Sequence, residues 1–376
     1  MIPLRKKALL LQLFAVLLVL TGCGDEKILE RLGFIHTAGY ELVPAENSDE
    51  PDRLRVTIAV PKADPEGKIK RETMTAVVAT SKEAKIEFSR QTELSLVSGQ
   101  LRNTLFGAAL ARKGIGEHID TFVRDPAISQ RMKITVVNGN VQHLLTRRYA
   151  EHPRPGQYVD RMLDKEAEAM MIPNVTLYDF TRDYYDDGID AVAPIIREKG
   201  KDITIDGIAL FQGDRYVARI DPDDSLIFAI LRRNFKRGEM SINLNSLGYG
   251  KEKLLFSSMV SSRKIKVNRG ENGGLSVQIR MLVKGSVLEY VGDLKIGEEE
   301  DRHKLEKRIA EYLTSNAQKM IDAMQRHKAD SIGIGKHVRN SMSYAEWKST
   351  NWDELYPNIE VKCSTEVVIK HFGKFM

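Results

Sequence analysis

The chain has 376 residues, of which 57 are basic and 52 acidic, so its formal net charge is +5. Charges of both signs are interleaved along the sequence, without the basic stripe of a nucleic-acid-binding domain, and we therefore expect no nucleic-acid partner. The length exceeds what one hydrophobic core usually serves and predicts two or three domains. The two cysteines, Cys23 and Cys363, are too few for a disulfide framework.

Residues 1–22 have the pattern of a secretory signal peptide. Three basic residues, Arg5 to Lys7, precede an apolar run over 8–20, and the small residues Thr21 and Gly22 follow. A helix needs about 20 apolar residues to cross a bilayer, so this run is too short for a permanent span. The pattern therefore predicts export of the chain and removal of the leader.

Cys23 directly follows the small residues of the leader. The segment Leu20-Thr21-Gly22-Cys23 resembles a bacterial lipoprotein lipobox, in which the cysteine thiol receives diacylglycerol before cleavage. The alternative is an ordinary signal peptide whose cleavage site happens to contain a cysteine. We predict that the mature chain begins at Cys23 and is held on the outer face of a membrane, because two or more acyl chains anchor a protein durably.

The first half of the mature chain mixes predicted strands and helices. Alternating apolar residues indicate strands, and apolar residues three and four positions apart indicate helices. The predicted strands are 54–60, 74–80 and 132–137. The predicted helices are 101–112, which Gly114 would end, 119–124, 160–171 and 178–190, with a loop over 152–156.

The second half is dominated by hairpins and one long helix. Residues 203–211 and 216–220 predict one hairpin, and 264–268 and 275–283 a second, joined by a glycine-rich turn. Acidic residues at 298–301 suit the start of a helix, whose apolar face contains Leu305, Ile309, Tyr312, Leu313, Met320, Ile321 and Met324. The last strand spans 361–369 and places Cys363 on its apolar side, which favours a structural thiol.

Catalytic and metal-binding patterns are nearly absent. The loop Ile332 to Lys336 resembles a phosphate-binding loop but continues with His337 in place of Ser or Thr. Ser98-Gly99 lacks the preceding glycine of a nucleophile elbow, and no His-Glu-x-x-His motif occurs. We therefore expect no enzymatic activity, no cofactor and no metal.

Three other groups of residues have competing interpretations. Asp221, Asp223 and Asp224 resemble calcium ligands in composition, but the EF-hand glycine and glutamate are missing, so we favour a cap of the helix over 226–231. The aspartates and tyrosines of 178–190 would suit a polar partner surface or a cationic ligand, and we favour the solvated side of an amphipathic helix. For Trp347 and Trp352 we favour core packing over ligand binding.

The order of residues from Ile309 to Gly373 is the most specific signature in the chain. It runs through an amphipathic helix, Gln325 to Asp330, Ile332-Gly333-Ile334-Gly335, Arg339, Trp347-Lys348, Trp352, Tyr356 and a strand ending in Phe372-Gly373. This order closely resembles the C-terminal region of the Ger(x)C spore germination lipoproteins, the C subunits of nutrient germinant receptors in spore-forming Bacillus and Clostridium relatives.

The resemblance extends over essentially the full length. Asp206 to Phe211, followed by Asp214 to Val217, is similar to the middle of that family. The opening is similar through Cys23, Asp25, Glu30, Leu32 and Phe34, although Gly24 and Asp25 stand where the family commonly has a tryptophan.

The resemblance implies three mixed α/β domains and no catalysis. It also implies lipid anchoring on the outer surface of the spore inner membrane and two integral-membrane partner subunits, one of them resembling an amino-acid permease. We expect an α+β fold with mainly antiparallel sheets packed with helices. The expected boundaries are a signal peptide over 1–22, an N-terminal domain over 23–197, a small middle domain over 198–254 and a C-terminal domain over 255–376 that contains the long helix.

Our leading hypothesis is a non-catalytic, lipid-anchored subunit of a germinant receptor, with Cys23 as its one functional residue. The alternative is a lipid-anchored solute-binding protein that delivers a nutrient to a membrane transporter, which would need two lobes around a deep cleft. An exported cell-envelope hydrolase would need a nucleophile and base that the sequence does not display.

Overall fold

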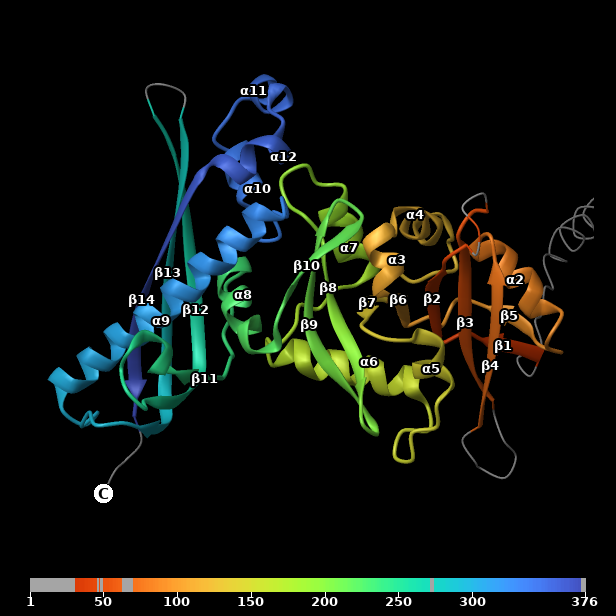
Figure 1. The fold of residues 1–376 in the computed structure, drawn as a ribbon, viewed down its shortest axis with the longest axis horizontal. Coiled ribbons are helices and arrows are strands. Elements are labelled where there is room, and N and C mark those ends of the chain that lie inside the picture. The colour runs from red at the N-terminus through yellow and green to blue at the C-terminus, as the bar shows by residue number, and fades with distance from the viewer. Residues whose placement is uncertain (1–30, 46, 48–49, 63–69, 271–273, 373–376) are drawn as a thin grey trace, which may run out of the picture.

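The structure is a computed structural model that describes residues 31–45, 47, 50–62, 70–270 and 274–372. The leader and Cys23 lie outside the described residues. Two large sheets with their helices form an elongated molecule, with the first sheet at one end and the last sheet at the other (Figure 1). Among the described helices, none combines the length and apolarity that crossing a membrane requires.

An eight-stranded mixed sheet forms the first part of the molecule. Its spatial order is β10-β9-β8-β7-β6-β2-β3-β4, with β2, β6, β7 and β8 parallel and an antiparallel pair at each side. The strands are β2 (Thr37–Val43), β3 (Arg53–Lys62), β4 (Lys70–Val78), β6 (Asn103–Gly107), β7 (Lys133–Val137), β8 (Val192–Lys199), β9 (Asp202–Gln212) and β10 (Arg215–Ile220).

Helices cover both faces of this sheet. On one face α5 (Val141–Thr146) and α6 (Pro155–Glu168) pack in a core with Leu105. On the other face, α2 (Ser81–Ser89), α3 (Ala108–Lys113), α4 (Gly116–Arg124) and α7 (Leu177–Tyr184) pack with Phe106 in the larger core. Adjacent residues of β6 thus belong to opposite cores, as expected for a central strand buried on both sides.

A small pair of strands lies near the start of the described chain. Strand β1 (Leu32–Phe34) pairs in parallel with β5 (Ser95–Val97), and β5 contacts α2. The described chain therefore begins at the end of the molecule that carries α2 (Figure 1).

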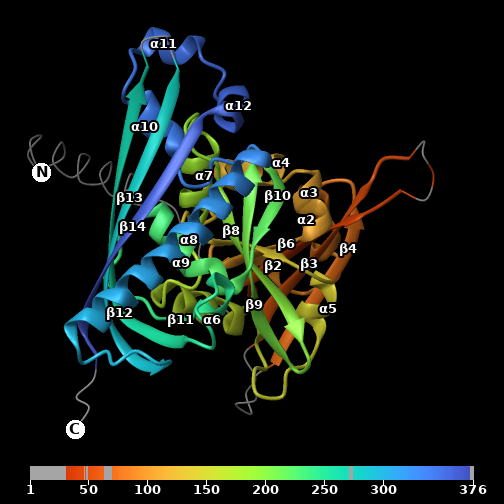
Figure 2. The same ribbon diagram turned by 60° about the vertical axis from the view of Figure 1, so that its left-hand side comes forward.

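The last sheet has the order β11-β12-β13-β14 and carries the long helix α9 (Glu299–Arg326) across it (Figure 2). Its strands are β11 (Met240–Asn243), β12 (Lys253–Arg269), β13 (Leu275–Val291) and β14 (Glu360–His371). Between the two sheets lies α8 (Ser225–Arg232), and α10 (Ile334–Arg339), α11 (Tyr344–Ser349) and α12 (Trp352–Leu355) follow α9.

Polar side chains of α9 protect the edge strand β14. The backbone N–H groups of Cys363, Thr365 and Ile369 donate to Gln318 Oε1, Thr314 Oγ1 and Glu306 Oε1 at 3.1, 3.0 and 2.8 Å. An edge strand without such partners would offer these groups to another chain. The helix therefore supplies both an apolar face and the missing ladder partners.

The α+β class is confirmed, as are the hairpin β9–β10, the helix α4 and the amphipathic face of α9. The parallel centre of the first sheet was not predicted. That sheet also continues past residue 198 through β9 and β10. The division into units 23–197, 198–254 and 255–376 stays a prediction.

Several predicted boundaries are wrong. The helix expected over 101–112 starts only at Ala108, because Asn103–Gly107 forms strand β6. A short apolar run is compatible with the periodicity of a buried helix and with that of a buried strand, so the pattern could not separate the two. The helix α6 begins at Pro155, inside the expected loop, since proline is well tolerated at the first helical position. The expected helix over 178–190 ends at Tyr184, and the strands of the second hairpin extend to 17 residues each.

Candidate functional site

The loop that resembled a phosphate-binding loop is built around the carboxylate of Asp330. Its Oδ1 accepts from the backbone N–H of Ile334 at 2.8 Å, and its Oδ2 accepts from Gly335 N–H at 2.6 Å and from Trp352 Nε1 at 3.2 Å. Gly333 precedes α10 with φ of 75°, a left-handed conformation that glycine adopts without strain. The loop's backbone donors are thus occupied by the chain itself.

A second buried aspartate ties this loop to the first part of the molecule. Asp190 Oδ2 accepts from the backbone N–H of Asp330 at 2.7 Å, while its Oδ1 accepts from Gly213 N–H at 3.1 Å. The N–H of Asp190 in turn donates to the carbonyl of Asp330 at 3.0 Å. Asp190 therefore connects the β9–β10 turn to the loop that follows α9. We call the contacts centred on Asp190 and Asp330 the junction.

The junction leaves no room for side chains at two glycines. A Cβ on Gly335 would lie 2.7 Å from Trp352 Nε1 and 2.8 Å from Gly188 Cα. A Cβ on Gly188 would lie 2.8 Å from the backbone N of Lys336, which itself donates to Gly188 O. The backbones of the two parts therefore touch directly.

The acidic segment after α7 pairs with the C-terminal helices. Arg339 Nη1 donates to Asp186 Oδ1 at 2.9 Å and also contacts Asp187. Trp347 Nε1 donates to Asp187 Oδ2 at 2.9 Å. The arginine and the tryptophan of the C-terminal signature thus both bind aspartates about 150 residues earlier in the chain.

Asp183 forms a buried ion pair. Its Oδ2 lies 2.5 Å from Arg232 Nη2 of α8, its Oδ1 lies 2.9 Å from Arg182 Nε, and Lys336 is 3.6 Å away. Only 2% of Asp183 is exposed. The solvated-helix interpretation of 178–190 is therefore wrong for its inward side, although Tyr178 and Tyr185 are exposed. The inward aspartates instead contact the chain's own C-terminal part and α8, and the alternative of a polar partner surface or a cationic ligand stays untested.

Burial governs the titration of the two central carboxyls. It raises the pKa of Asp190 to about 7 and that of Asp330 to about 6, although the backbone N–H donors act in the opposite direction. No catalytic role follows, because their oxygens are occupied by backbone and indole donors. The junction holds the two parts of the chain together. The sequence analysis did not predict that Asp183, Asp190 or Gly188 would contribute to these contacts.

The remaining sequence candidates have structural roles. Trp347 and Trp352 are buried with ring centroids 5.8 Å apart, as expected for packing. Asp224 precedes α8 but makes no side-chain cap bond, so the predicted cap is wrong, and Asp221 pairs with Arg219 at 2.6 Å. Burial raises the pKa of Cys363 to about 11, as fits a structural thiol.

Within the described ranges, no three His, Cys, Asp or Glu side chains converge on a possible metal position.

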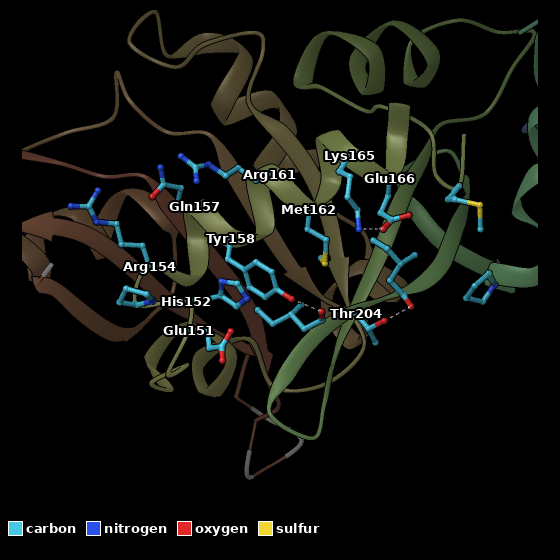
Figure 3. Close-up of a pocket in the computed structure, with 15 residues that line it drawn as sticks. Glu151, His152, Arg154, Gln157, Tyr158, Arg161, Met162, Lys165, Glu166 and Thr204 are labelled. Carbon is cyan, nitrogen blue, oxygen red and sulfur yellow. Dashed lines mark hydrogen bonds and ion pairs between the residues drawn. The ribbon is translucent and has the colours of Figure 1, made fainter. Parts of the chain in front are cut away.

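An open groove of about 760 Å³ lies between α6 and β9. Figure 3 shows Arg154, Arg161 and Lys165 around it, with the rings of His152 and Tyr158 stacked 3.7 Å apart. Lys165 is neutralised by Glu166 at 2.7 Å. The lining displays no hydrogen-bonded nucleophile and base, so this groove offers binding without evident chemistry.

Comparisons with known proteins cover nearly the whole chain. Residues 25–198 match the family described as spore germination protein N-terminal domain, and residues 206–373 match the family described as spore germination B3/GerAC like, C-terminal. Spore germination protein GerQC of Bacillus cereus is 24% identical over 362 residues, covering 96% of this chain and 98% of that protein. Spore germination protein B3 of Bacillus subtilis is 22% identical over 379 residues, covering 96% of each.

The fold also has a counterpart among solved structures. The crystal structure of the GerBC protein aligns with a TM-score of 0.54 at 16% identity, covering 88% of this chain and 97% of that one.

Proposed function

Because the chain belongs to the GerAC-like family of spore germination proteins, we propose that it is the lipid-anchored, non-catalytic C subunit of a nutrient germinant receptor. The observation that carries the proposal is the match of both family regions over residues 25–198 and 206–373, directly after a lipobox ending at Cys23. The proposed location is the outer face of the spore inner membrane.

The anchor would set the distance of the folded part from the membrane. Arg31, the first described residue, follows Cys23 by eight positions, so an extended linker spans at most about 30 Å. A tethered subunit is confined with its membrane partners, which raises their effective concentration without any new contact. The proposed partners are two integral-membrane subunits.

The rigid junction supports this proposal over delivery of a solute. A solute-binding protein with two lobes needs a hinge that opens and closes. Here Gly188 packs directly on the backbone of α10, and Asp183 and Asp190 are buried against the C-terminal part. Opening at this place would expose paired charges.

Germination of mutant spores tests the proposal. Spores lacking the chain should lose their nutrient response, and a chain with Cys23→Ala should restore it poorly because it is not held beside its partners. The matched control is Cys363→Ala, which removes the other cysteine and should restore the response fully. A normal nutrient response in spores without the chain, in a host with no second copy, would contradict the proposed role.

A further inference from the structure

A second cavity, of about 510 Å³, lies between α2 and α4 above β2 and β3. Both helices cover the same face of the first sheet (Figure 2). Its walls are mainly apolar and include Val56, Ile58, Phe88, Leu101 and Phe122, each at most 4% exposed. We call it the α2–α4 pocket. The pocket is open to solvent, so its apolar walls lack contacts that a ligand would supply.

One polar group inside the pocket has no partner. Tyr40 lines it from β2 and is only 7% exposed, yet its hydroxyl forms no hydrogen bond with any described residue. Its ring is held by Phe106 and Phe122 at centroid distances of 5.6 and 5.7 Å. The hydroxyl oxygen is not among the fully buried polar atoms without a partner, so it keeps some exposure and can donate to a ligand that enters the pocket.

The lining of the pocket contains two lysines and one carboxylate among the described residues. Lys82 and Lys85 line it from α2, and neither forms an ion pair with a described residue. Of the two glutamates of α2, Glu87 pairs with Arg90, whereas Glu83 accepts from Ala79 N–H and keeps its negative charge. The one carboxylate in the lining, Asp125, accepts from the backbone N–H of Ala127 at 3.0 Å.

We propose that the α2–α4 pocket binds an amphipathic anion, a ligand with one aliphatic chain and a negatively charged head group. The chain packs against the walls, the head group meets Lys82 and Lys85 at the rim, and Tyr40 donates to an oxygen of the ligand. Pockets of about 300–1,000 Å³ with apolar walls and a few polar groups are the usual form of a small-molecule site.

Two sources could supply this chemistry, a free fatty acid and an acyl chain of an anionic phospholipid. Ile35 lines the pocket and follows Cys23 by twelve positions, so an anchored Cys23 would keep the pocket within about 43 Å of the bilayer. Both sources are therefore physically accessible, and the experiment below separates them.

Calorimetric titration with dodecanoate, below its micelle concentration, tests the site. The protein is the mature chain from residue 23 with Cys23→Ala, which needs no detergent and keeps every described residue, so the result does not depend on lipidation. We expect saturable binding of one dodecanoate per chain. The double variant Lys82→Glu/Lys85→Glu should bind about tenfold more weakly, since two attractive charges become repulsive. Tyr40→Phe should bind about fivefold more weakly, through loss of one hydrogen bond.

The matched control is Lys199→Glu/Lys201→Glu, which makes the same charge change at exposed positions, at the end of β8 and in the β8–β9 turn. It should bind dodecanoate like the parent chain. Thermal unfolding checks that each variant is folded.

Sedimentation with phosphatidylglycerol vesicles is the second arm. Saturable binding of dodecanoate identifies the free fatty acid as a sufficient ligand. If dodecanoate does not bind but the chain sediments with the vesicles, and Lys82→Glu/Lys85→Glu abolishes this sedimentation, the ligand is an acyl chain of a phospholipid in the bilayer. Absence of both would overturn the proposal. Equal binding by the charge-reversed chain, or equally tight binding of dodecyltrimethylammonium, would also overturn it, because neither is compatible with recognition of an anionic head.

Discussion

At the scale of single residues, Asp330 forms the largest number of hydrogen bonds in the junction. Its carboxylate accepts three hydrogen bonds, from Ile334, Gly335 and Trp352, and its N–H binds Asp190. An ionised carboxylate has only acceptors, and here all of the facing groups are donors. The carboxylate of Asp330 therefore matches its position in hydrogen-bonding chemistry.

Asp330→Asn tests this match. The amide NH₂ would face one or two N–H groups that now donate to the carboxylate, which leaves buried donors unpaired at about 1–3 kcal/mol each. We expect the free energy of unfolding to fall by about 2–4 kcal/mol, measured by urea denaturation. Asp293→Asn, at an exposed aspartate, is the control and should change it by less than about 0.5 kcal/mol. Equal stability of the two variants would mean that Asp330 is not an obligatory acceptor.

The titration of Asp190 and Asp330 predicts a pH dependence. Burial raises the pKa of these carboxyls to about 7 and about 6, above about 3.9 for an unfolded chain. Between these values the folded state binds more protons than the unfolded state, so their contribution to stability is complete below about pH 4 and is lost as pH rises towards 7. Neighbouring Asp353 raises the pKa of Asp190 further.

The expected result is a shallower pH dependence when one of these groups is removed. Urea midpoints measured from pH 5 to 8 should fall more steeply for the parent chain than for Asp190→Asn. A control at Asp186, whose pKa is lowered despite burial because Arg339 binds it, should keep the parent slope in this range when changed to Asn. Parallel curves for the parent and Asp190→Asn would refute the assignment.

At the scale of elements, the position of α10 depends on contact between two backbones. Gly188 follows α7, and Gly335 lies in the first turn of α10, so α10 cannot move away from Gly188 without losing its bonds to Asp330. Short helices of this kind have little intrinsic stability, and their placement comes from tertiary contacts.

The variant Gly335→Ala tests how closely the backbones of α10 and Gly188 must approach. The new methyl would overlap Trp352 Nε1 and Gly188 Cα, and overpacking of this type costs about 1–3 kcal/mol. Gly297→Ala is the matched control, because a Cβ there meets nothing within 4 Å and its φ is not left-handed. Thermal unfolding should show a lower midpoint for Gly335→Ala only. An equally lowered midpoint for Gly297→Ala, where no overlap exists, would contradict the explanation by overlap.

At the scale of the whole molecule, the periodicity of apolar residues in the sequence predicted the amphipathic helices and strands. The face of α9 and the alternation of β14 follow from one side being buried and the other exposed. Periodicity failed at β6, where both neighbours Leu105 and Phe106 are buried and no polar side exists. It also gave no indication that Asp183 would meet Arg232, because pairs 49 residues apart are brought together only by the fold.

The functional features also divide into those with a local sequence pattern and those formed by residues far apart in the sequence. The proposed leader and the lipidation of Cys23 rest on local patterns of the sequence and stay predictions. The junction joins Asp190 to Asp330 across 140 residues, and the α2–α4 pocket combines β2, β3 and two helices. Such sites have no contiguous motif: the C-terminal signature contained Asp330, Gly335 and Trp352 of the junction, but it did not indicate that Asp190 would meet them.

The most direct test of the central claim is the intact mass of the protein extracted from membranes of a sporulating host, with and without Cys23→Ala. We predict a chain that begins at Cys23, carries the added mass of diacylglycerol and sediments with membranes, whereas Cys23→Ala is found in the aqueous fraction. A parent chain of unmodified mass in the aqueous fraction would contradict the anchored-subunit account.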